Sequence, residues 1–111
     1  EILDYSKSYL DAERGEGGVI TDENLLHEED TVLLCRYNEQ VRQLAPFFRE
    51  VGTVHSYKGR EADKVFVVDF AIRDAEDENV QFVAYTRARD KLGIGTLNKA
   101  LEIGRRNKYG L

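Results

Sequence analysis

Two runs of continuous apolar residues most constrain how this chain can fold. TVLLCR (31–36) and KVFVVDFAI (64–72) place hydrophobic side chains at successive positions instead of alternating them with polar ones. A strand with this pattern is buried on both faces, which is typical of a parallel sheet covered by helices on each side. We therefore expect two core strands here, within an α/β domain that has a mainly parallel sheet.

Helical patterns and shorter strands alternate with these two runs. Asn38 and Asn79 are expected to cap two of the helices, Pro46 to kink or restart the first of these, and Gly52 to end it. The acidic stretches before Asp30 and over 74–79 read as loops. In chain order, helices are predicted over 1–13, 39–51, 80–91 and 98–111, strands over 52–56 and 92–96, and 19–20 is a candidate short strand.

Composition limits the classes of protein to which the chain can belong. Its 111 residues fit a single domain, 1–111, and the net charge of −5 argues against coating nucleic acid by bulk charge, although a local basic patch could still bind phosphates. No apolar run approaches the length of a membrane span, and no signal peptide is visible. We expect a soluble, cytoplasmic domain, and the start at Glu1 without any methionine favours a fragment of a larger protein.

Several kinds of site are disfavoured by the residues present. No Gly-Lys pair occurs anywhere, so the chain has no phosphate-binding P-loop of its own. His27 and His55 lack metal-ligand spacing, and no metal site is expected. Cys35 is the only cysteine and lies inside an apolar strand, where a thiol behaves as an inert hydrophobe.

Charged segments follow the predicted strands or precede the last one. They are 36–38, 55–61 and 86–87. Ligands of open parallel sheets bind beyond the carboxyl ends of the strands, so these segments indicate a site. Arg87 occupies a position in the apolar stripe of the 80–91 helix, and two interpretations are open: its head group reaches out to water, or its planar fork is held to meet a phosphate or carboxylate. Arg36, if it is considered alone, is explained by the end of a strand that reaches the solvent.

Taken in order, these segments resemble the C-terminal half of superfamily 1 helicases of the UvrD/Rep type. VLLCRYNEQV looks like motif IV of that family, TVHSYKGREADKV like motif V and FVAYTRARDKL like motif VI, and EILDYSKSYL is similar to the helix that follows motif III. The resemblance spans residues 1 to 97. It implies a three-layer RecA-like domain, related to P-loop NTPases but without a P-loop, that faces an N-terminal RecA-like domain of the same chain.

The resemblance also implies roles for particular residues. ATP and Mg²⁺ would be bound mainly by the N-terminal RecA-like domain, while Arg36 and Arg87 contact the γ-phosphate, with Arg87 as the arginine finger. The nucleotide would also meet Lys58, Gly59 and Glu61, and the backbone of single-stranded DNA would meet Thr53, His55 and Ser56. One short link touching both ligands would couple hydrolysis to movement along DNA.

One departure from the family leaves alternatives open. Larger members insert a subdomain between motifs IV and V, whereas only sixteen residues separate Arg36 from Thr53 here. The rival interpretation is a stand-alone module of the same fold that binds nucleic acid or protein without hydrolysing ATP. A third is an unrelated flavodoxin-like α/β domain with a chance motif match.

Overall fold

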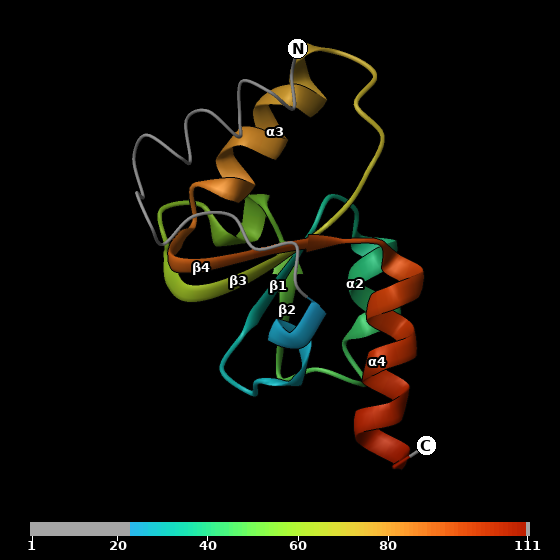
Figure 1. Ribbon diagram of the computed structural model, residues 1–111. Coiled ribbons are helices and arrows are strands. Elements are labelled where there is room, and N and C mark those ends of the chain that lie inside the picture. Colours follow the sequence, from blue (N-terminus) through green and yellow to red (C-terminus); the bar gives the residue numbers. More distant parts are fainter. Residues whose placement is uncertain (1–22, 111) are drawn as a thin grey trace.

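The computed structural model describes residues 23–110 as a parallel sheet with helices on both faces (Figure 1). The helix expected over 1–13 and the candidate strand at 19–20 lie outside these residues. In chain order the elements are η2 (Glu23–His27), β1 (Val32–Cys35), α2 (Asn38–Leu44), β2 (Glu50–Thr53), η3 (His55–Tyr57), β3 (Ala62–Val68), α3 (Ala75–Tyr85), β4 (Ala88–Gly95) and α4 (Leu97–Tyr109).

All four strands of the sheet are parallel, in the order β2-β1-β3-β4. The two apolar runs supply the central strands β1 and β3, which pair directly, with Val32 opposite Val65 and Leu34 opposite Val67. The predicted α/β class with a mainly parallel sheet is therefore confirmed. The three-layer arrangement is that of a RecA-like fold.

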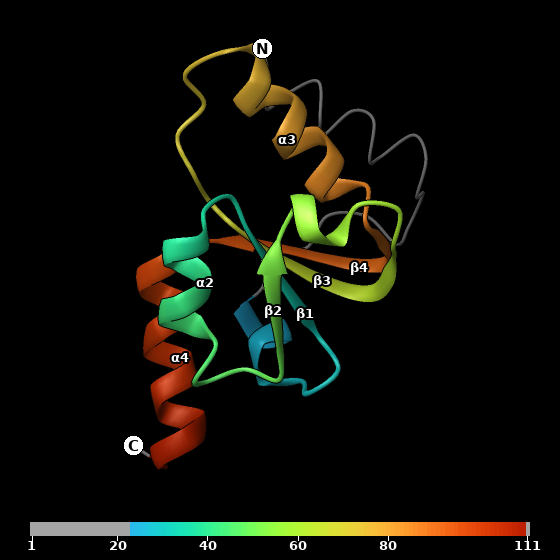
Figure 2. The ribbon, with the colours of Figure 1, turned by 180° about the vertical axis from the view of Figure 1, so that it is seen from behind.

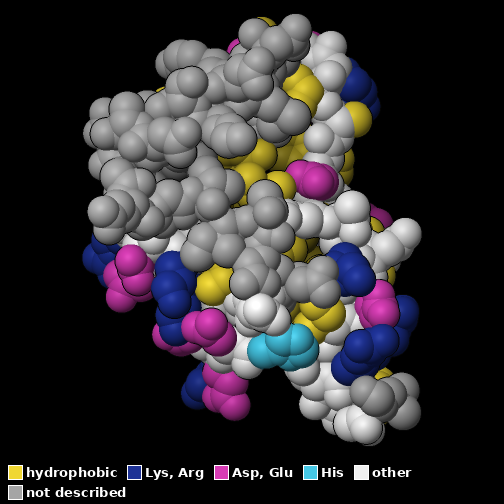
Figure 3. Space-filling view, viewed as in Figure 1, with side chains coloured by type: hydrophobic (Ala, Val, Ile, Leu, Met, Phe, Trp, Pro, Cys, Tyr) yellow, Lys and Arg dark blue, Asp and Glu magenta, His cyan; other side chains and the backbone are white. Residues whose placement is uncertain are grey.

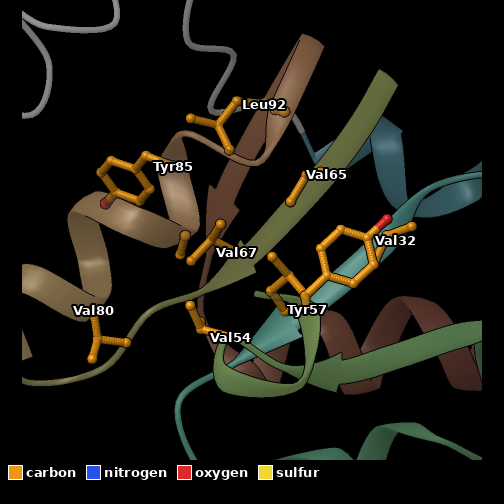
Figure 4. Packing of buried hydrophobic residues seen from close by; sticks show 11 residues of the cluster. Val32, Val54, Tyr57, Val65, Val67, Val80, Tyr85 and Leu92 are labelled. Carbon is orange, nitrogen blue, oxygen red and sulfur yellow. The ribbon is translucent and has the colours of Figure 1, made fainter. Parts of the chain in front are cut away.

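Alternate residues of β1 and β3 enter two separate cores. On one face, Val32, Val65 and Val67 pack against side chains of η3 and α3, including Val54, Tyr57, Val80 and Tyr85 (Figure 4). On the other face, Leu33, Phe66 and Val68 pack against η2, α2 and α4, which lie together in Figure 2. Because side chains alternate across a strand, burial on both faces requires the continuous apolar pattern.

The segment between β1 and β2 differs from the prediction in three ways. Helix α2 ends at Leu44, because Pro46 has no backbone N–H with which to continue the helix, although Ala45 just before it keeps a helical φ of −55° and ψ of −35°. Tyr37, not Asn38, is the N-cap residue, and the Gln40 side chain accepts from the Tyr37 amide at 3.1 Å. Gly52 lies inside β2 and ends no helix, so the strand expected over 52–56 begins two residues earlier and stops at Thr53.

Helix α3 begins five residues before the predicted start. Asp74 is its N-cap, and the Asp74 carboxylate accepts from the Asp77 amide at 2.9 Å. The acidic stretch 74–79 is thus mostly helix, with carboxylates in the first turn where the helix dipole favours them, and the prediction of an Asn79 cap is wrong. The helix ends at Tyr85, so Arg87 lies between α3 and β4 and not within a helix.

The last helix agrees with the prediction. Thr96 caps α4 by accepting from the Lys99 amide at 3.1 Å, and Gly110 ends it with a left-handed φ of 71°. Among residues 23–110, no helix is long and apolar enough to cross a membrane.

Two glycines of β4 make room for Phe66, the largest of the fully buried side chains among the described residues. A Cβ at Gly93 would lie 2.8 Å from Phe66 Cδ2 and 2.9 Å from Leu25 Cδ1, and a Cβ at Gly95 would lie 2.8 Å from Phe66 Cζ. Such contacts are shorter than side chains tolerate, so the Phe66 ring fits only because both positions lack a side chain.

We expect Gly93→Ala to lower the free energy of unfolding by about 1–3 kcal/mol, because the added methyl group overpacks the core. Urea unfolding of the variant and the parent measures this difference. Phe66→Leu in the Gly93→Ala background should recover part of the loss by freeing space. A loss that does not depend on the residue at position 66 would contradict the explanation.

Candidate functional site

The two arginines singled out by the sequence lie at opposite ends of the sheet. Arg36 follows the carboxyl end of β1, whereas Arg87 precedes β4, and the Arg87 carbonyl accepts from the Ala62 amide at the amino end of β3 at 3.0 Å. The seven residues of β3 separate these two levels, which is about 20 Å at roughly 3.3 Å per residue. Each guanidinium is also held by neighbours at its own end. One phosphate could contact both only if both side chains left these partners and extended toward each other.

The segment from Val54 to Glu61 connects the two ends. It leaves the carboxyl end of β2, forms the 3-10 turn η3, and returns across one face of the sheet to the amino end of β3 (Figure 1). Val54 and Tyr57 are buried in the core below it, so the segment is anchored to the sheet at two points. We call residues 54–61 the crossover link.

Thr53, His55 and Ser56 lie together at the carboxyl end of β2. The Thr53 hydroxyl accepts from the Ser56 amide at 3.1 Å, and the Ser56 hydroxyl donates to the Thr53 carbonyl at 2.8 Å. These reciprocal bonds fix the start of the crossover link in a turn typical of Ser and Thr. The imidazole of His55 is exposed next to this turn.

A small cleft lies between the crossover link and α3. Its volume is about 140 Å³, and it is lined by Val54, His55, Lys58, Asn79, Val80 and Val83. His55 and Lys58, predicted to contact different ligands, thus border the same cleft. Its lining is mostly apolar, with polar side chains contributed by these two residues and by Asn79.

Arg87 is half-buried at the other end of the crossover link. It donates from Nε to the Val83 carbonyl at 3.2 Å, from Nη1 to the Arg60 carbonyl at 3.1 Å, and from Nη2 to the Thr86 hydroxyl at 3.1 Å. These bonds join the end of α3 to the crossover link. A guanidinium has five N–H donors, so these three bonds leave capacity for an anion.

The remaining predicted nucleotide contacts, within residues 58–61, are distant from Arg87 in the chain but flank Arg60, whose carbonyl accepts from Arg87. Gly59 has a φ of 80°, a left-handed conformation that a residue with a side chain adopts only with strain. Arg60 stacks over the Tyr57 ring with its Cζ 4.4 Å from the ring centroid, which fixes the backbone around Gly59. Lys58 and Glu61 are exposed. The structure therefore brings Gly59, Glu61 and Arg87 to one end of the sheet.

Arg36 is held by a buried carboxylate that the sequence did not single out. Its Nε donates to Asp77 Oδ1 at 3.2 Å, and only 17% of the side chain is exposed. The other oxygen, Oδ2, accepts from the backbone amide and from Nε of Arg73, both at 3.2 Å. Arg73 also donates to the Tyr37 hydroxyl at 2.6 Å. Asp77 thus joins the end of β1, the segment before α3 and the first turn of α3.

Asp77 is ionised despite its burial. Removal from water disfavours the charged form, but hydrogen bonds from the backbone and side chain of Arg73 and from Arg36 outweigh this effect, so the pKa of the Asp77 carboxyl is below its ordinary value. The sequence carried one signal for this residue. With Asp74 recognised as an N-cap, position 77 falls in the first helical turn, four residues after Arg73, where an ion pair forms readily.

Metal and thiol chemistry find no support in the part of the chain that the structure describes. No group of three or more His, Cys, Asp or Glu side chains there could hold a metal ion. Burial raises the pKa of the Cys35 thiol to about 12, which keeps it protonated and unreactive. Basic and acidic side chains of the described residues are interspersed where they are visible in Figure 3, and they form no broad positive patch there.

The fold and the arrangement of polar groups define a RecA-like α/β domain that lacks its own phosphate-binding loop. The family model for the UvrD-like helicase C-terminal domain matches residues 50–94, which include the crossover link, α3 and Arg87. The resemblance stated from the motifs is thereby confirmed over this segment: residues 50–94 are similar to a UvrD-like helicase C-terminal domain. Arg36 lies before the matched residues. The comparison with curated proteins gave no significant match.

We expect Asp77→Asn to destabilise the folded chain near neutral pH, and we expect the loss of stability to be smaller in acid. The folded state holds the pKa of Asp77 below its unfolded value of about 3.9, so the carboxylate contributes stability above that pH and loses it as the pH falls further. Thermal unfolding of parent and variant between about pH 6 and pH 3 should show the stability gap narrowing.

Asp63→Asn is the matched control, because Asp63 is exposed and, within residues 23–110, forms its ion pair with Arg89 alone. Its effect should be small and nearly independent of pH. A gap for Asp77→Asn that stays constant down to pH 3 would show that the ionised carboxylate is not the stabilising species.

Proposed function

We propose that this chain supplies the second RecA-like domain of an ATP-dependent DNA helicase. In this role it completes an ATP site held mainly by an N-terminal RecA-like domain and couples ATP hydrolysis to movement along single-stranded DNA. The observation that carries the proposal is the crossover link, which lies within the helicase family match and joins the predicted DNA contacts to the predicted nucleotide contacts.

Arg87 is the arginine finger in this proposal. Its guanidinium is fixed by three hydrogen bonds and retains donor capacity, which is what a cation must offer to stabilise charge on a phosphoryl group bound by a neighbouring domain. Gly59 lets the backbone approach the nucleotide, and Lys58 and Glu61 contact it, with Glu61 accepting from the ribose. Because the sequence has no P-loop, ATP and Mg²⁺ are held mainly by the N-terminal RecA-like domain.

Thr53, His55 and Ser56 bind the backbone of single-stranded DNA at the other end of the link. The support for these contacts is local: a turn closed by two hydrogen bonds presents the His55 imidazole and the Thr53 hydroxyl, groups that contact phosphate and sugar without reading sequence. With few basic side chains involved, binding by this domain alone is weak and sensitive to salt.

The crossover link provides the coupling. It is anchored by Val54 and Tyr57 in the core and by Arg87 at its far end, so a displacement at the nucleotide end moves the DNA end. Closure of the two RecA-like domains around ATP then shifts the DNA contacts.

A second function remains in competition, because Arg36 and Arg87 do not lie at one end of the sheet. A module that binds nucleic acid or protein without hydrolysis does not need two arginines on one phosphate. The ATPase activity of the full-length protein separates the two functions, since the module would have none.

Arg87→Ala in the full-length protein is expected to lower DNA-stimulated ATPase activity by about 1,000-fold or more, while DNA affinity changes little. Steady-state ATPase assays and fluorescence anisotropy with oligothymidylate measure the two quantities. Arg89→Ala is the matched control, because Arg89 is exposed and its one ion pair in the described part of the chain is with Asp63. Unchanged hydrolysis in Arg87→Ala would contradict the finger assignment, provided that thermal unfolding shows an intact fold.

His55→Ala is expected to reduce the stimulation of ATPase activity by single-stranded DNA about tenfold, with little change in KM for ATP, because each lost nucleic-acid contact is worth about 1–3 kcal/mol. His27→Ala serves as the control, since His27 bonds to Asn107 away from the crossover link. Equal stimulation of His55→Ala and parent would argue against a DNA contact at His55.

A further inference from the structure

Asp77 is unusual among the charged residues of this structure. The residue is 1% exposed, yet it carries a full negative charge between Arg36 and Arg73. Both of its oxygens accept hydrogen bonds, and three bonds from these arginines reach it. Burial of a carboxylate is costly, and a buried ion pair often stabilises a fold no better than apolar residues of similar size. Stability alone therefore gives a weak reason for this arrangement.

The hydrogen bond from Arg36 to Asp77 uses only the Nε donor of the guanidinium. Nε faces Asp77, while the two terminal nitrogens keep their other donors. Nη2 lies 3.9 Å from Glu76, whose side chain is 73% exposed, so this second pairing is weak. An arginine held at Nε presents Nη1 and Nη2 as a fork, the geometry with which arginine binds a phosphate in two parallel hydrogen bonds.

Arg73 and Tyr37 fix the carboxylate in turn. Arg73 occupies Oδ2 through its backbone amide and its Nε, which leaves Oδ1 to Arg36. The Tyr37 hydroxyl accepts from Arg73, and the Tyr37 ring lies 5.3 Å from Arg36 Cζ. Asp77 and the exposed Glu76 balance the formal charge of Arg36 and Arg73, and Asp74 also lies near Arg73, so an anion would be held by the donors of the Arg36 fork and not by a net positive charge. The cluster sits past the carboxyl ends of the strands, where anions commonly bind in open parallel sheets.

We propose that Asp77 is a positioning residue that orients Arg36 to bind a phosphate group. This rests on the proposed function, because the phosphate comes either from ATP or from the backbone of single-stranded DNA. Both sources offer the same oxyanion to the fork. Asp77 touches neither ligand and acts through Arg36 alone.

The test is a double-mutant cycle in the full-length protein, with Arg36→Ala, Asp77→Asn and the two combined. One arm measures kcat and KM of the ATPase at saturating oligothymidylate, and the other measures the Kd for oligothymidylate without nucleotide. Whichever arm responds to Arg36→Ala identifies the source of the phosphate. Glu78→Gln is the matched control, because Glu78 lies in the same helical turn and, among the described residues, pairs with neither arginine.

Positioning predicts that Asp77→Asn reproduces the loss of Arg36→Ala within about threefold, which is less than 1 kcal/mol, and adds nothing in the Arg36→Ala background. A purely structural carboxylate would instead lower activity by the same factor in both backgrounds, and that result overturns the proposal. Parental activity in Asp77→Asn overturns it as well.

Two further outcomes keep this test separate from the proposed function. If Arg36→Ala changes neither arm while Arg87→Ala abolishes hydrolysis, the motor assignment stands and this inference fails. If the parent protein hydrolyses no ATP and binds no DNA, the proposed function itself fails. Should Asp77→Asn not fold, as judged by thermal unfolding, Asp77→Glu keeps the charge but shifts it by one methylene, and the same non-additivity with Arg36→Ala is required.

Discussion

The burial of β1 and β3 on both faces determines the rest of the structure. Side chains that alternate across these strands enter two cores, so each face of the sheet must be covered by a separate set of helices. The strands pair in parallel. Each connection between successive strands must therefore cross one face of the sheet and return to its amino end. All three connections between the described strands do so, two with a helix and one with a 3-10 turn, and where they begin and end places the polar groups at both ends of the sheet.

The shortest of these connections carries the functional proposal. The crossover link passes from β2 to β3 in eight residues, 54–61, and meets the core at Val54 and Tyr57. Its polar residues are therefore distributed between both ends of the sheet, with His55 at one and Glu61 at the other. In the proposed function each end of the link meets a different ligand, so the charged residues of this connector would have a functional reason as well as a structural one.

The sequence predicted the class of fold well and the element boundaries less well. Apolar runs identify β1 and β3 because a strand buried on both faces has apolar residues at successive positions, which is easy to recognise in the sequence. The start of α3 was missed because 74–79, five polar residues and one alanine, resemble a solvated loop, although Asp74 and the helix dipole make them a favourable first turn. Gly52 resembled a helix end, but the chain had already left α2 at Leu44 and the position belongs to β2.

The same error concealed the partner of Arg36. A carboxylate in a loop has no defined neighbours, whereas in the first turn of α3 it lies between Arg36 and Arg73. The positions of Arg36 and Arg87 relative to each other were missed as well. The prediction placed Arg87 within a helix, whereas α3 ends at Tyr85 and Arg87 lies directly before β4, at the amino end of the sheet. The turn formed by Thr53 and Ser56, by contrast, uses bonds between near neighbours of the kind that local sequence encodes.

The length of the crossover link has a consequence for how this chain can vary. Eight residues that must travel back along a seven-residue strand leave almost no slack. An inserted residue would loosen the connection and let one end shift without the other, whereas a deleted one would pull Val54 or Tyr57 out of the core. The number of residues in this link is therefore fixed by the distance it must span as well as by the ligands its side chains are proposed to contact. Changes of chain length are better tolerated at the exposed turn around Pro46.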